Sequence, residues 1–158
     1  MTNDENPILK NMKDIDENLY SVVKEFQTNI MSLNTEYNSI ANDTEFGLKN
    51  LFGYRYTQKL GKLFNQNTNS LKDVHNNIEL IPSKTAKKTK LDIYRYILNL
   101  ILTLKRVEMK FKLMMCSSGK YLNNDSTYHK AFPLNNYHVL ECDILTLENS
   151  LYEKLIQK

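Results

Sequence analysis

The fold is decided by residues 7–41, which are PILKNMKDIDENLYSVVKEFQTNIMSLNTEYNSIA. Apolar side chains recur in this stretch at steps of three and four residues, a spacing that places them on one face of an α-helix. Asn6 is a predicted N-cap, and Pro7 suits the first helical position because an N–H there has no helical partner. We therefore predict a helix over 7–41. Its apolar row is Ile8, Met12, Ile15, Leu19, Val22, Phe26, Ile30, Leu33, Tyr37 and Ile40.

A helix of this length extends for about 50 Å, and its apolar row needs a long partner. Two interpretations of that partner are open. The row is covered inside the fold by the next helix, or its first part extends past the core and binds another chain as a coiled coil. In the second case the partner-helix face is Ile8, Met12, Ile15, Leu19, Val22 and Phe26.

A second helix is predicted over 43–81. The sequence at 42–45 is Asn-Asp-Thr-Glu, which has the form of a capping box. Pro82 ends the helical pattern because proline cannot continue it. Gly47, Gly53 and Gly61 lie within this helix and each cost about 1 kcal/mol relative to Ala, but a glycine also lets two helices approach closely.

The second half of the chain predicts two further helices. A polar, basic connector covers 82–90, and the next helix is predicted over 91–116. The first half of that helix is apolar nearly all round, which is typical of a central helix in a bundle. Residues 117–136 lack periodicity and are predicted to form a long loop. The last helix is predicted over 137–157, with Asn136 as its N-cap.

Composition supports the same class of fold. Glycine and proline number only 4 and 3 in 158 residues, too few for the many turns of an all-β protein. We predict an all-α protein, a single helical domain over 1–158. Its architecture is an elongated bundle of about four helices, in which two long antiparallel helices precede two shorter ones.

Basic residues concentrate between Pro82 and Phe132, where eleven Lys and Arg stand against three Asp and Glu, although the net charge of the chain is only +3. Such a segment can hold the phosphates of nucleic acid or of anionic lipids. The alternative is a solvated face that acidic residues of the last helix offset, namely Glu141, Asp143, Glu148 and Glu153. The candidate anion-binding residues are Lys84, Lys87, Lys88, Lys90, Lys105, Arg106, Lys110 and Lys112.

The N-terminal residues show neither a secretory signal nor a transit peptide. The most apolar run, 97–104, is far shorter than the roughly 20 residues that span a bilayer. Cys116 and Cys142 are not in CxxC spacing and are expected to be reduced thiols. We expect an intracellular protein, cytoplasmic or nuclear, without a transmembrane segment.

Motifs of catalysis and metal binding are missing from the sequence. It lacks a glycine-rich phosphate loop, HExxH and GxSxG, and its three histidines are scattered. We therefore expect no catalytic residue, no metal and no cofactor. The predicted function is that of a non-enzymatic scaffold or subunit that binds protein, as a hetero- or homo-oligomer, through its helices. The alternative is binding of anionic lipid or nucleic acid through residues 84–112.

Overall fold

Every regular element that the structure describes is an α-helix. This computed structural model describes residues 6–42, 54–117 and 133–157. The helices are α1 (Pro7–Ile15), α2 (Glu17–Asn42), α4 (Tyr54–Ile78), α5 (Lys87–Ser117) and α8 (Leu134–Ile156). The prediction of an all-α bundle is therefore confirmed. The predicted order of lengths is wrong, because α5, with 31 residues, is longer than α2 or α4.

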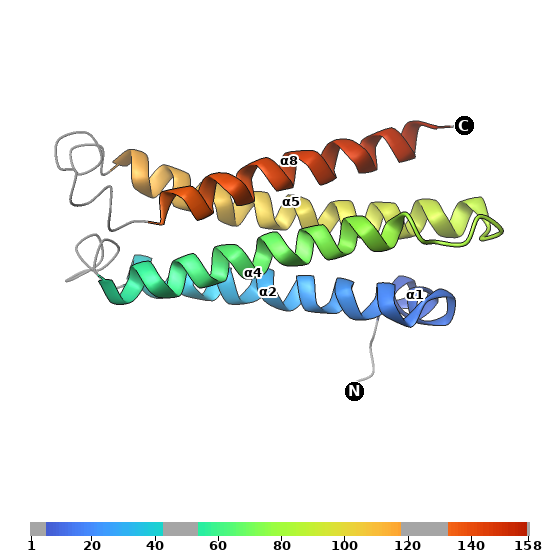
Figure 1. Ribbon diagram of the computed structural model, residues 1–158, viewed down its shortest axis with the longest axis horizontal. Helices are drawn as coiled ribbons and strands as arrows, with labels where there is room; N and C mark the ends of the chain where they lie inside the picture. The colour runs from blue at the N-terminus through green and yellow to red at the C-terminus, as the bar shows by residue number, and fades with distance from the viewer. Residues whose placement is uncertain (1–5, 43–53, 118–132, 158) are drawn as a thin grey trace.

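The long helices form a ring around one core. Figure 1 shows α2, α4, α5 and α8 running side by side, with α1 beside the turn that joins α4 to α5. Both α2 and α8 pack against α4 and against α5, so α4 lies diagonally across from α5. The structure thus places α5 at a corner of the bundle. The prediction for 91–116 had placed this helix at the centre. Four helices around one core leave no central position.

The helix predicted over 7–41 is interrupted at Asp16. Its backbone is extended, with φ −160° and ψ 109°, and its N–H donates to the Met12 carbonyl at 2.8 Å. Its side-chain Oδ1 accepts from the Asn18 N–H at 2.9 Å. Asp16 therefore ends α1 and caps α2, because an Asp oxygen satisfies an N–H that the first turn leaves free. The predicted cap at Asn6 is confirmed, since its side chain accepts from the Ile8 N–H at 2.7 Å.

The apolar row of the first stretch faces the core, but its register differs from the prediction in both α1 and α2. In α1, Leu9 is buried and the predicted Ile8 only partly so. Leu19 and Phe26 are fully buried as predicted, but Val23 is buried and Val22 only partly so. With Val23, the steps between the buried positions of α2 alternate four, three, four and three. The prediction chose Val22 because it counted through Asp16, where the helix breaks and the register starts again. The buried positions of α2 in this row are Leu19, Val23, Phe26, Ile30 and Leu33.

Three other helix ends differ from prediction by more than one residue. α5 begins at Lys87, within the connector that was predicted over 82–90. α4 ends at Ile78, not at 81, although Ile81 still packs against the core. α8 begins at Leu134, ahead of the predicted start at 137. The predicted capping box at 42–45 and most of the predicted loop at 117–136 lie outside the described residues.

Asn136 joins α8 to α4 and does not cap a helix. Its Nδ2 donates to the Gly61 carbonyl at 3.2 Å. A Cβ at Gly61 would lie 3.0 Å from that same nitrogen. The close approach of two helices that a glycine permits is therefore realised at Gly61, where the start of α8 meets α4.

A buried polar layer joins α2 to α4. Asn29 Nδ2 donates to Ser70 Oγ at 2.6 Å, and Asn67 Nδ2 donates to the Asn29 carbonyl at 3.1 Å. Asn67 Nδ2 also donates to the Leu63 carbonyl of its own helix at 2.9 Å. Sliding one helix past the other would therefore break the Asn29–Ser70 hydrogen bond and leave Ser70, which is buried, without that partner, at a cost of about 1–3 kcal/mol. The layer therefore favours one register of α2 on α4, as a buried Asn does in coiled coils.

We predict that Leu104→Ala lowers the free energy of unfolding by about 2–5 kcal/mol, because Leu104 is fully buried on α5. Leu80 is the control, since its side chain in the α4–α5 turn is 67% exposed. Leu80→Ala should change the same quantity by less than about 0.5 kcal/mol. Urea denaturation of the three proteins measures both changes. Equal losses would show that the core face of α5 is assigned wrongly.

Candidate interaction surface along the α5–α8 seam

Two ion pairs hold α5 against α8 in a fixed antiparallel register. Lys105 Nζ lies 3.0 and 3.1 Å from the two carboxylate oxygens of Glu148. Lys112 Nζ lies 3.5 Å from Glu141 Oε2. The two lysines are seven residues apart, and so are the two glutamates, which is close to two helical turns. Both pairs therefore lie on the same edge of the helix pair, and we call them the charge ladder.

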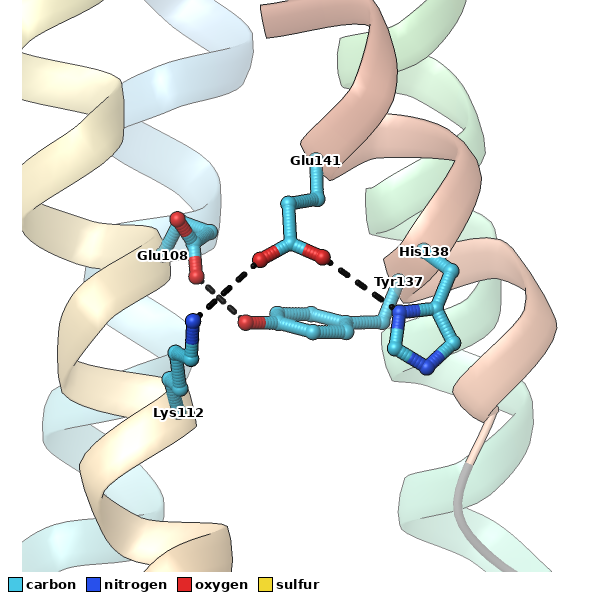
Figure 2. Close-up of polar contacts among 5 residues, drawn as sticks. All are labelled: Glu108, Lys112, Tyr137, His138 and Glu141. Atoms are coloured by element: carbon cyan, nitrogen blue, oxygen red, sulfur yellow. Dashed lines mark hydrogen bonds and ion pairs between the residues drawn. The ribbon is translucent and has the colours of Figure 1, made fainter. Parts of the chain in front are cut away.

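A buried contact reinforces this register on the core side. Figure 2 shows the Tyr137 side chain reaching from α8 to Glu108 on α5, where its hydroxyl donates to Oε2. Both residues are buried, and the Tyr137 ring packs edge-on against Phe64 at 5.9 Å between centroids. In the same view Glu141 lies between Lys112 and His138, whose Nδ1 is 3.4 Å from Glu141 Oε1. The seam thus pairs its charges across the two helices.

Exposed apolar side chains occupy the same edge. Met109 lies four residues after Lys105 and three before Lys112, so it shares the face of α5 that carries these lysines. Leu145 is placed in the same way between the two glutamates on α8. Their exposed fractions are 47% and 49%. The two side chains therefore lie on facing helices between the same two ion pairs.

This apolar edge continues in both directions along the seam. Leu113 follows Met109 by four residues on α5. On α8, Tyr152 and Ile156 follow Glu148 at steps of four. Partly buried Leu102 precedes the first lysine by three. We call this set the seam surface: Leu102, Met109, Leu113, Leu145, Tyr152 and Ile156.

The seam surface concentrates the exposed apolar residues of the bundle. Eight large apolar side chains are exposed in the described part of the chain, and five of them belong to the seam surface, whereas none lies on α4. Single exposed apolar residues are normal on a monomer, but a contiguous group marks an interaction site. The sequence signal that could have found it is the spacing of Lys and Met on α5, which matches that of Glu and Leu on α8.

The predicted partner-helix face lies elsewhere and is used within the fold. Three of its members are fully buried, namely Met12, Leu19 and Phe26. The other three are partly buried and pack against the core, namely Ile8, Ile15 and Val22. The ring of helices covers this row. The interpretation from sequence named only the next helix, α4, as its cover, whereas α5 packs against α1 and α2 as well.

The candidate anion-binding residues separate into two groups. In the second half of α5, Lys105 and Lys112 pair with Glu148 and Glu141 of α8. Asp143, also named in the alternative, lies instead 4.0 Å from Lys72 on α4. Lys110 lies over the Tyr37 ring at 5.5 Å from its centroid and 3.4 Å from Asn34 Oδ1. Arg106 is exposed. This half of the basic segment is therefore largely neutralised or occupied by protein contacts.

The other group gathers at the start of α5. Lys88 pairs with Asp92 at 3.0 Å, and Lys84 is exposed. An open groove of about 370 Å³ lies between the start of α5 and the end of α8. Its lining residues are Ser83, Thr85, Lys87, Lys90, Leu91, Tyr94, Lys154 and Gln157. Three of these are lysines and none is acidic. Lys154 pairs with Glu79 Oε1 at 3.0 Å, so the positive charge of the lining comes from Lys87 and Lys90.

Comparisons with protein-family models, with curated proteins and with solved structures give no match. Within 6–42, 54–117 and 133–157, His, Cys, Asp and Glu form no group of three or more that could hold a metal ion. None of the helices in these ranges combines the length and apolar character needed to cross a bilayer. The helical surfaces are therefore the features from which a function can be inferred.

We predict that Tyr137→Phe lowers the free energy of unfolding by about 1–3 kcal/mol, because it leaves the buried Glu108 carboxylate without its donor. Tyr152→Phe is the matched control, since Tyr152 is exposed. The double variant Tyr137→Phe with Glu108→Leu should recover much of the loss, because neither polar group then remains. A double-mutant cycle without coupling energy between the two positions would contradict the proposed role of this hydrogen bond in the seam.

Proposed function

We propose that this chain is a non-enzymatic helical subunit that binds a protein partner through the seam surface. The observation that carries the proposal is the gathering of five of the eight exposed large apolar side chains along one seam. Met and Tyr, two of the residue types present there, are enriched in protein interfaces. This proposal puts the interaction face on α5 and α8, whereas the candidate face from the sequence was on the first helix.

Charge pairing makes the seam surface suitable for burial. A partner that covers this edge also covers Lys105 and Lys112, which already pair with Glu148 and Glu141. A charge that is buried without its partner destabilises a complex strongly, whereas a paired one does so far less. Full burial of an apolar side chain contributes about 1.5–3 kcal/mol, and the largest gains come from Leu113 and Ile156, which are 61% and 77% exposed.

Photo-crosslinking tests this proposal in the cells that produce the protein. A photoreactive amino acid at Met109 or Leu145 should give adducts with a protein partner upon irradiation. Asn69 and Lys72 are matched control positions, because both are exposed on α4. Adducts of the same kind and yield from α4, or none from the seam positions, would contradict the proposal.

Binding of an anionic surface through the start of α5 is the second candidate function. Lys87, Lys88 and Lys90 lie in its first four residues, and its first turn holds no acidic residue. This arrangement opposes the helix dipole, which favours negative charge at an N-terminus by about 0.3–1 kcal/mol. A phosphate group in the positively lined groove would offset that repulsion.

Salt dependence tests the second candidate. Changing Lys84, Lys87, Lys88 and Lys90 to Ser should flatten the log–log plot of duplex-DNA affinity against salt by about 0.9 for each phosphate that is no longer neutralised. Affinity for vesicles that contain phosphatidylserine should fall as well, by about 1 kcal/mol for each lysine near the surface. The matched control removes the same charge from four other exposed positions, Lys10, Lys13, Lys24 and Lys62. Equal effects of both sets would mean that only net charge matters.

A further inference from the structure

We infer that the end of the bundle at which α4 turns into α5 docks on an anionic phospholipid bilayer and inserts Leu80 and Ile156 below the headgroups. The inference rests on the second candidate function, binding of an anionic surface, and names lipid as that surface. We call this end the basic tip and define it as residues 79–90 and 153–157. Figure 1 shows the α4–α5 turn and the end of α8 at the same end of the bundle.

An ion pair joins the two segments of the basic tip. Lys154 Nζ on α8 lies 3.0 Å from Glu79 Oε1, directly before the turn. Leu80 follows Glu79 in the chain, and Ile156 lies two residues after Lys154. The two apolar side chains therefore belong to the same end surface, although 75 residues of the chain lie between them.

The basic tip carries the two most exposed large apolar side chains in the described part of the chain. Ile156 is 77% exposed and Leu80 is 67% exposed. Leu80 lies in a connection, whereas the other large exposed apolar residues of the described ranges lie in helices. Insertion of both side chains into the boundary between headgroups and acyl chains removes this apolar surface from water.

Lysines that lack an acidic partner surround these side chains. The basic tip holds five lysines and two glutamates. One lysine pairs with Glu79, and Lys88 pairs with an aspartate farther along α5. Lys84, Lys87 and Lys90 form no ion pair with any described residue. Their charge is therefore available to lipid phosphates, as in basic segments that bind the anionic leaflet.

The combination of basic and apolar residues favours a bilayer over a nucleic acid. A bilayer presents anionic headgroups above an apolar layer, so it complements lysines that lie beside exposed Leu80 and Ile156. The backbone of duplex DNA complements the lysines alone. End-on docking also leaves Met109 and Leu145 free, because they lie along the side of the bundle. A protein partner on the seam surface and a bilayer on the basic tip are thus compatible.

Vesicle flotation tests the apolar contribution. The chain should bind vesicles of phosphatidylcholine with phosphatidylserine. Leu80→Ser and Ile156→Ser should each weaken that binding about tenfold, because each removes an inserted side chain. Met31→Ser is the matched control for Leu80, since Met31 is 64% exposed but lies on α2. Val139→Ser is the control for Ile156, since Val139 is exposed near the opposite end of α8. Neither control should change vesicle affinity, and Leu80→Ser should not change affinity for duplex DNA.

A fluorescent probe tests insertion directly. In a chain that carries Cys116→Ser and Cys142→Ser, an environment-sensitive fluorophore on Leu80→Cys should shift to shorter wavelength when the same vesicles are added. The fluorophore on Met31→Cys should not. An unchanged spectrum at position 80, or equal vesicle affinity of Leu80→Ser and Met31→Ser, would overturn the inference.

The lysine variant separates this failure from failure of the second candidate function. If changing Lys84, Lys87, Lys88 and Lys90 to Ser weakened vesicle binding while Leu80→Ser did not, the tip would bind anionic headgroups without insertion. If the same change weakened only binding of duplex DNA, the anionic partner would be a nucleic acid and the inference would be wrong. If it weakened neither, the inference and the second candidate function would both be wrong.

Discussion

A helix at the corner of a four-helix ring can turn only one side toward the core, and this constraint determines where apolar side chains stay exposed. α5 uses its core side for residues such as Leu104 and Phe111, which are fully buried. It carries further apolar residues, among them Met109, on the edge next to α8. The helix therefore has more apolar surface than its corner position can cover, and α8 adds Leu145 on the same edge. These exposed apolar side chains form the proposed interface.

Polar contacts decide how that surplus is arranged. The Asn29–Asn67 layer sets α2 on α4, and the charge ladder with Tyr137 sets α8 on α5. A helix that slides by one turn can still bury its apolar side chains. The same slide costs free energy when a buried polar group loses its hydrogen-bond partner. The register fixed in this way brings the exposed residues of two helices to the same level. A continuous surface is thus a consequence of contacts between polar groups.

Sequence periodicity predicted what depends on local geometry and missed what depends on neighbours. Phe26 is buried because three-four spacing defines a helix face whatever surrounds it. Asp16 was missed because an Asp within such a pattern can face solvent or cap a helix, and only the packing of α1 decides between them. Asn136 is a residue type that often caps helices, yet its side chain donates a hydrogen bond to the Gly61 carbonyl on α4. The seam surface was missed because exposure of Met109 depends on which helices lie beside α5.

The most direct test of the proposed interface compares two methionine side chains by NMR. In a protein with ¹³C-labelled Met methyl groups, a soluble paramagnetic agent reports how accessible Met109 and Met31 are in the purified chain and after an extract of the producing cells is added. Both side chains are exposed in the chain alone, at 47% and 64%. We expect Met109 to become protected in the extract as the partner binds, while Met31 stays accessible. An unchanged response of Met109, or equal protection of both methyl groups, would contradict the proposed interface.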